Sequence, residues 1–82
     1  MAMFVGVHTM GTSMPEDKMK ESWESYKVAC AKAGLTAKHA HMNAEQGKAF
    51  CVTEANSSEE VQKAHEAAGV PVSEIIEVKD FN

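Results

Sequence analysis

Four histidines and one of two cysteines carry the side chains in this sequence that are best suited to chemistry: His8, His39, His41, His65 and Cys51. Imidazole and thiolate are the groups that hold nickel, copper and zinc in proteins. The sequence has no Cys-x-x-Cys pair, so it lacks the two-thiolate loop that is typical of copper and zinc chaperones. The first hypothesis is therefore a metal site built from several imidazoles and one thiolate.

Length and composition narrow the classes of protein that fit. The 82 residues are enough for one domain, which we expect to span residues 1–82. The net charge is -4 and all eight cationic side chains are lysines. Arginine is the usual bidentate reader of phosphate and guanine, so its absence argues against a nucleic-acid partner. An acidic chain is instead the natural complement of a cation.

The hydropathy pattern predicts a cytoplasmic protein without a membrane partner. No apolar run approaches the roughly 20 residues of a membrane span, and the first ten residues lack the pattern of a signal peptide. Two cysteines are too few for the disulfide framework of a small secreted protein. We therefore expect Cys30 and Cys51 to be free thiols.

Turn and capping residues divide the chain into six elements. The apolar run 3–7 predicts a strand that ends at His8. A capping box of Ser13 and Glu16 predicts a helix over about 15–33, which Gly34 ends. Segments 36–42 and 48–53 predict a hairpin, Ser57 caps a second helix that ends at Gly69, and 75–78 predicts a last strand.

This order of elements predicts the fold class. Strand, helix, strand, strand, helix, strand is the ferredoxin-like βαββαβ arrangement of the α+β class, with two helices on one face of a four-stranded antiparallel sheet. The sequence therefore predicts one helix-covered face and one open face, and side chains that alternate between them along each strand.

Strand alternation places most of the candidate ligands on one face. Eight apolar residues suit the helix-covered face: Val5, Val7, Ala40, Met42, Phe50, Val52, Ile76 and Val78. The opposite face then carries His8, His39, His41 and Cys51. If residue 43 pairs with residue 47, His39 lies directly opposite Cys51. His65 lies in the last turn of the second helix and faces the covered side, so it must reach around the rim or come from a partner subunit.

Structural interpretations compete with ligation at several positions. His65 suits the C-terminal end of a helix dipole, and this structural role competes with a ligand role. Cys30, Trp23 and Tyr26 lie on the apolar stripe of the first helix, which favours the core. The six methionines are dispersed in the sequence and are interpreted mainly as core and loop residues.

Several separated motifs carry a resemblance to a known family. They are His39-Ala40, Gly47-Lys48-Ala49-Phe50-Cys51, Ala64-His65-Glu66, Ala68-Gly69 before Pro71, and Glu74-Ile75-Ile76-Glu77-Val78, with Phe4 and Val7-His8 near the start. Together they resemble the small ferredoxin-like nickel-binding proteins, a family formerly described as a domain of unknown function. The resemblance implies a homodimer that binds Ni²⁺ through histidine and cysteine, with His8, His39, Cys51 and His65 as the candidate ligands. His41 and Val70 depart from the family pattern.

The function that this resemblance favours is metal sequestration or delivery without catalysis. The same donors also suit Zn²⁺ and Cu²⁺, so the residues alone do not select the ion. An alternative is a small dimeric ferredoxin-like enzyme, of the cofactor-free monooxygenase or isomerase type, with His8 or His39 as general base. A cavity lined by aromatic side chains would favour that enzyme. A third alternative is a sheet-mediated dimerisation module with incidental histidines.

Overall fold

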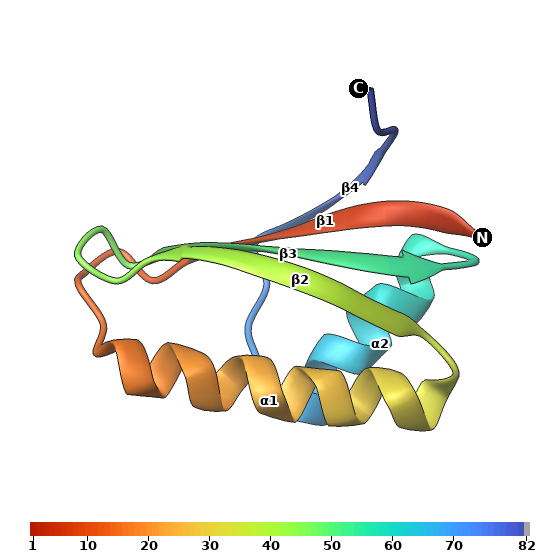
Figure 1. Ribbon diagram of the computed structural model, residues 1–82. Coiled ribbons are helices and arrows are strands. Elements are labelled where there is room, and N and C mark those ends of the chain that lie inside the picture. Colours follow the sequence, from red (N-terminus) through yellow and green to blue (C-terminus); the bar gives the residue numbers. More distant parts are fainter. Residues whose placement is uncertain (82) are drawn as a thin grey trace.

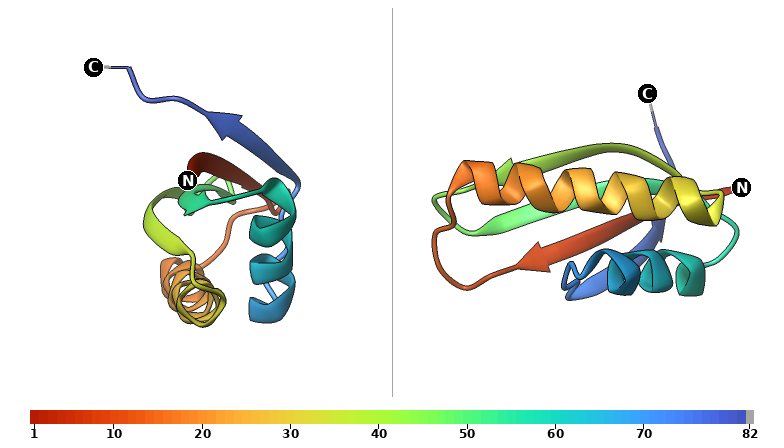
Figure 2. Two further views of the ribbon diagram at one scale, coloured as in Figure 1. Left: turned by 90° about the vertical axis from the view of Figure 1, so that its right-hand side faces the viewer. Right: turned by 90° about the horizontal axis from the view of Figure 1, so that it is seen from below.

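The computed structural model describes residues 1–81, which form four strands and two helices. The elements are β1 (Ala2–Thr9), α1 (Glu16–Ala33), β2 (Thr36–Asn43), β3 (Lys48–Ala55), α2 (Ser58–Ala68) and β4 (Glu74–Val78). The strands form one antiparallel sheet in the order β2-β3-β1-β4. Both helices cover the same face of the sheet (Figure 1; Figure 2). The predicted ferredoxin-like fold is confirmed.

The first helix begins at a different cap from the one predicted. Pro15 is the N-cap residue of α1, in an extended conformation, and no side chain accepts a hydrogen bond there. The predicted capping box is wrong because Ser13 lies two residues before the cap, outside the first turn. Glu16 and Asp17 place negative charge at the positive end of the helix dipole instead. The predicted end is confirmed, since Gly34 adopts the left-handed conformation with a φ of 78°.

The second helix begins where the sequence predicts. The Ser57 hydroxyl accepts a hydrogen bond from the Glu60 backbone N–H at 3.3 Å. The Glu60 carboxylate in turn accepts from the Asn56 backbone N–H at 2.8 Å. The first bond satisfies an N–H group that helix geometry leaves without a partner, and the second ties the residue before the cap to the first turn. They fix the start of α2, and therefore the position of the residues further along it.

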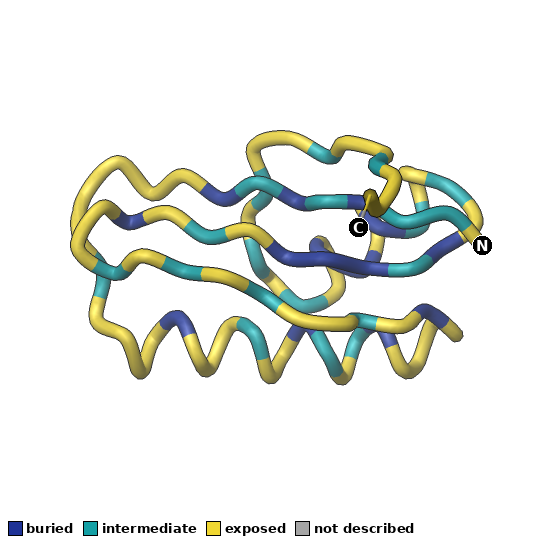
Figure 3. Tube along the Cα trace, turned by 45° about the horizontal axis from the view of Figure 1, so that its top comes forward, coloured by how far each residue is buried: buried dark blue, intermediate teal, exposed yellow. Residues whose placement is uncertain are grey.

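The sheet presents the opposite set of β1 side chains to the helices from the set predicted. Phe4, Gly6 and His8 are buried beneath the helices, whereas Val5 and Val7 alternate with them on the other side and are only half-buried (Figure 3). The run 3–7 is apolar or glycine throughout, so alternation of polarity gave no choice between the two faces. The assignment of Val5 and Val7 to the covered face placed His8 on the open face, and the burial of Phe4, Gly6 and His8 shows that this assignment is wrong.

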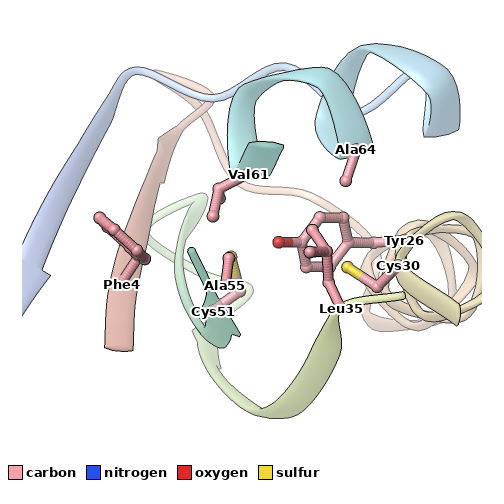
Figure 4. Close-up of a cluster of buried hydrophobic side chains, with 8 residues drawn as sticks. All are labelled: Phe4, Tyr26, Cys30, Leu35, Cys51, Ala55, Val61 and Ala64. Atoms are coloured by element: carbon pink, nitrogen blue, oxygen red, sulfur yellow. The ribbon is translucent and has the colours of Figure 1, made fainter. Parts of the chain in front are cut away.

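The core lies between the sheet and the two helices (Figure 4). It contains Phe4, Tyr26, Cys30, Leu35, Cys51, Ala55, Val61 and Ala64, with Trp23 packed against it. The predictions that Cys30 and Tyr26 belong to the core and that both cysteines are free thiols are confirmed. Of the helices formed within residues 1–81, none combines the length and hydrophobicity needed to cross a membrane.

Candidate metal centre

Three of the predicted ligands meet inside the core, and we call them the triad: His8 from β1, Cys51 from β3 and His65 from α2. The His8 Nε2 atom lies 3.3 Å from Cys51 Sγ, and Cys51 Sγ lies 3.4 Å from His65 Nε2. All three candidate ligand atoms lie within 4.8 Å of one another. The side chains are buried, and His65 has no exposed surface at all.

The pairing of β1 with β3 and the position of α2 bring the triad together. In the sheet, Gly6 pairs with Cys51 and His8 pairs with Ala49, so His8 and Cys51 lie diagonally across neighbouring strands on the same face. His65 reaches them from the buried side of α2. It needs neither the rim of the sheet nor a partner subunit, because the cysteine faces the helices and not the open side.

Backbone carbonyls fix the orientation of both imidazoles. His8 Nδ1 lies 2.7 Å from the Pro71 carbonyl oxygen, and His65 Nδ1 lies 2.8 Å from the Val61 carbonyl oxygen. A carbonyl oxygen only accepts, so each Nδ1 must carry a hydrogen and donate it. Each Nε2 is then an unprotonated lone pair directed at Cys51 in the neutral ring. The single thiol hydrogen can satisfy only one of these two lone pairs.

Burial keeps the three groups uncharged. Desolvation lowers the pKa of His8, and the bond to the Pro71 carbonyl opposes this only in part. Burial likewise lowers the pKa of His65, against the opposing bond to the Val61 carbonyl. Burial raises the pKa of Cys51 to about 11. At neutral pH both imidazoles are therefore ready to donate electron pairs to a metal, and the thiol loses its proton only if a cation stabilises the thiolate.

Gly6 keeps open the space between Cys51 and His65. A Cβ atom at this position would lie 2.8 Å from Cys51 Sγ and 3.3 Å from both Cε1 and Nε2 of His65. The sequence-based prediction did not identify this residue. Its signal is a glycine between Val5 and Val7 inside a strand, a position where glycine often marks the close approach of another group.

The two sulfur–nitrogen distances of the triad fit a transition metal. An ion with metal–nitrogen bonds of about 2.0 Å and a metal–sulfur bond of about 2.3 Å holds tetrahedral nitrogen and sulfur ligands about 3.5 Å apart. The two sulfur–nitrogen distances of 3.3 and 3.4 Å are within a few tenths of an ångström of that value. In metal-binding proteins, a histidine ligand typically donates its other ring N–H to a carbonyl or a carboxylate. Both imidazoles of the triad donate in this way to backbone carbonyls.

Tyr26 supports the triad from α1. Its ring stacks on the imidazole of His65, with ring centroids 4.1 Å apart and an interplanar angle of 29°. Its hydroxyl lies 2.6 Å from the hydroxyl of Thr53, which is fully buried. Burial raises the pKa of Tyr26 above its usual range, so the phenol stays neutral. The tyrosine therefore holds His65 in place without adding a charge.

A cavity of about 340 Å³ lies beside the triad. His8 and Cys51 contribute to its wall, together with Trp23 and Tyr26 from α1. Four of the six methionines also line it: Met10, Met14, Met19 and Met42. The methionines are dispersed in the sequence, but loop 10–15, α1 and β2 bring these four together around the cavity.

His39 and His41 lie apart from the triad, on the open face of the sheet. Both are exposed, and their ring centroids are 5.1 Å apart in an edge-on arrangement. The predicted register is wrong, since Ala40 and not His39 pairs with Cys51. The hairpin closes with Asn43 opposite Lys48, one residue later than assumed, which turns His39 away from the thiol.

Fold and site together define a small ferredoxin-like protein with a buried His-Cys-His cluster that could hold a metal ion. The chain belongs to the family described as nickel responsive protein SCO4226-like, whose model matches residues 4–78. A solved structure, the crystal structure analysis of SCO4226 from Streptomyces coelicolor A3(2), is similar with a TM-score of 0.89. The two chains share 26% sequence identity over 99% of this chain and 100% of the other. No curated protein matches the chain.

Proposed function

We propose that the protein binds a transition metal, nickel in the first place, through His8 Nε2, Cys51 Sγ and His65 Nε2. One observation carries the proposal: two imidazole lone pairs, each fixed by a carbonyl bond on the other ring nitrogen, converge on one buried thiol. Without a cation this arrangement leaves one lone pair without a hydrogen to accept, which is costly inside a protein. A metal ion would displace the thiol proton to water and bind all three atoms.

Nickel is proposed because of the family to which the chain belongs. Imidazole and thiolate also bind Zn²⁺ and Cu²⁺, and the usual order of affinities places copper above nickel. Selectivity in a cell must therefore depend on which metal is available. Because all three residues of the triad are buried, slow exchange of the metal is expected, which suits sequestration or delivery to a partner.

A cytoplasmic homodimer is the form we propose. The two thiols are free, as a reducing compartment requires. The open face of the sheet exposes the large apolar side chains Phe50 and Ile76, by 42% and 41% respectively. A second copy that covers this face would bury that apolar surface.

Titration of nickel into the metal-free, reduced protein tests the proposal. The protein is purified without a histidine tag, because a tag binds nickel itself. Calorimetry should show one tight site per chain, together with a thiolate-to-nickel absorption band. Cys51→Ala should remove the band and weaken binding by at least about 100-fold, since a ligand contributes more than the 10–100-fold of an outer-shell partner.

Two matched variants make this experiment specific. Cys30→Ala removes the other buried thiol, and His39→Ala removes an exposed imidazole. Both should keep the absorption band and the affinity of the wild type. Unchanged binding in Cys51→Ala, or loss of binding in His39→Ala, would show that nickel is held elsewhere.

The cavity favours the enzyme alternative as a second candidate. Trp23 and Tyr26 line it, which is the aromatic lining that the sequence-based alternative requires. As a general base, however, His8 has Nδ1 occupied by the Pro71 carbonyl and Nε2 directed at Cys51. A base with neither nitrogen free toward the cavity is poorly placed to take a proton from a substrate. Metal binding therefore ranks first, and a metal-free turnover that depends on His8 would reverse the order.

A further inference from the structure

The triad supplies three candidate ligands, one fewer than the four of a closed tetrahedral site. The three candidate ligand atoms come from His8, Cys51 and His65. Zinc-type sites with four protein ligands are structural, whereas sites with three protein ligands keep a position for a water or another molecule. In this protein, two of the three ligand-bearing side chains, His8 and Cys51, also form part of the wall of the cavity. A fourth ligand can therefore approach from the cavity.

The cavity is large enough for an organic molecule and not only for water. An engineered cavity of about 150 Å³ accepts benzene, and small-molecule sites span roughly 300–1,000 Å³. The cavity beside the triad measures about 340 Å³. It therefore has room for a ring of six atoms with a short substituent.

The side chains that line the cavity favour a ligand with an apolar body. Trp23 and the four methionines named above provide most of the large side chains around it, and among the described residues that line it none is Asp, Glu or Lys. Methionine is unbranched and polarizable, so it adapts to ligands of different shape. A charged or strongly polar body would lose hydration here without gaining a partner.

The charge of the metal selects the donor atom. A divalent ion bound to two neutral imidazoles and one thiolate keeps one net positive charge, and no carboxylate lines the cavity to balance it. An uncompensated charge is costly in an apolar environment. An anionic donor that reaches the metal from the cavity removes that cost, and a soft thiolate matches the metals that imidazole and cysteine bind.

We propose that the cavity binds a small apolar thiol whose sulfur completes the coordination of the metal held by His8, Cys51 and His65. The thiol gives its proton to water as the sulfur–metal bond forms, and no electron is transferred. This inference rests on the proposed function, since the thiol needs the metal. It adds to that function a second ligand, so that the cargo is a metal–thiol complex and not a bare ion.

The test uses cyclohexanethiol, an apolar ring with one thiol, under oxygen-free conditions. It is titrated into metal-free and Ni²⁺-loaded protein, by calorimetry and by the fluorescence of Trp23, the single tryptophan of the chain. The loaded protein should bind the thiol at least tenfold more tightly than the metal-free protein, with a new sulfur-to-nickel absorption band. Cyclohexanol, which has the same ring without the soft donor, should not distinguish the two forms.

A pair of variants locates the binding site. Ser22 lines the cavity, whereas Ser25, three residues later on α1, lines the separate groove between α1 and α2. Both serines are exposed, so each accepts a larger side chain without disturbing the core. Ser22→Phe should weaken thiol binding at least fivefold while nickel binding persists, and Ser25→Phe should change neither.

Each other outcome overturns the inference. Equal thiol binding with and without nickel means that the cavity takes apolar molecules but that the sulfur does not reach the metal. If the thiol does not bind, or if Ser22→Phe binds it as tightly as the wild type does, the cavity is not the binding site of the thiol. Nickel affinity is measured first in each sample, so failure of the metal site is seen separately from failure of the thiol to bind a loaded site.

Discussion

Two pairs of histidines in this protein have the same separation and opposite properties. The ring centroids of His8 and His65 are 5.1 Å apart, as are those of His39 and His41. The first pair is buried, each ring donates to a carbonyl, and both point a lone pair at a thiol. The second pair is exposed on the open face. The two pairs therefore differ in burial and orientation and not in separation, and only the buried pair directs fixed lone pairs at a common thiol.

The largest contrast is expected on removal of one ring from each pair. His65→Ala removes a proposed ligand and a fully buried ring stacked on Tyr26. Nickel affinity should fall by at least about 100-fold, and the free energy of unfolding of the metal-free protein by about 2–4 kcal/mol, the usual cost of a large buried truncation. His39→Ala should change that free energy by less than about 0.5 kcal/mol. Calorimetry measures the nickel affinity, and urea denaturation measures the free energy of unfolding. A larger change of either quantity in His39→Ala than in His65→Ala would reverse the comparison.

A methyl group at Gly6 should disable the buried pair without removing any ligand. In Gly6→Ala the new Cβ atom would lie 2.8 Å from Cys51 Sγ, so the thiol must move. The expected loss of nickel affinity is about tenfold or more, as is usual when a residue that positions a metal ligand is replaced. Val7→Ile adds a methyl group to the same strand on the open side and should leave the affinity unchanged. Wild-type binding by Gly6→Ala would show that the metal does not use Cys51.

The sequence predicted the positions of the elements better than the face of each strand. Gly34, Ser57 and Gly69 mark helix ends by their backbone geometry and capping chemistry, which depend on a few neighbouring residues. The face of β1 depends on which side the helices cover, and a strand that is apolar on both sides does not encode that choice. Strand register depends on the length of the hairpin loop, and an error of one residue was enough to place His39 opposite the thiol.

The candidate site was predicted only in part for a related reason. The types of His8, Cys51 and His65 are visible in the sequence, and all three were among the candidates. What orients them is not visible, since the Pro71 and Val61 carbonyls are backbone atoms that every residue possesses. The methionine-lined cavity likewise exists only when loop 10–15, α1 and β2 have packed together.

The stability of the metal-free protein should fall on both sides of neutral pH. The pKa values of His8 and His65 are lowered by burial in the folded state, so below their ordinary value of 6.5 the unfolded chain binds more protons. Stability is then lost as the pH falls, by at most about 1.4 kcal/mol per pH unit for each proton. The pKa of Cys51 is raised from 9.0 to about 11, so the unfolded chain loses its proton first, and stability falls as the pH rises between these values.

Urea denaturation at a series of pH values measures this profile. His8→Gln should flatten the acid side, and Cys51→Ser should flatten the alkaline side, because each removes one of the groups that titrates differently in the two states. An acid slope that is unchanged in His8→Gln would show that the buried imidazole does not produce it.

A smaller effect is expected from the hydroxyl that supports the buried pair. Tyr26→Phe removes the 2.6 Å hydrogen bond between Tyr26 and the fully buried Thr53 hydroxyl, at a cost of about 1–3 kcal/mol in unfolding free energy. The double variant Tyr26→Phe with Thr53→Val should recover part of this loss, since both polar groups are then gone. Nickel affinity should change less than about threefold in both, because the ring still stacks on His65. A tenfold loss of affinity in Tyr26→Phe would instead make the hydroxyl part of the site.

The smallest effect is expected on the open face. The double variant His39→Gln with His41→Gln removes both exposed rings, which have freedom to turn and no shared centre to hold them. The free energy of unfolding should change by less than about 0.5 kcal/mol, as is usual for surface substitutions. The tight nickel site should keep a stoichiometry of one per chain, with the thiolate-to-nickel band unchanged. If tight nickel binding disappears, His39 and His41 bind the metal. The orientation of the imidazole lone pairs is then not what distinguishes the buried pair of histidines from the exposed pair.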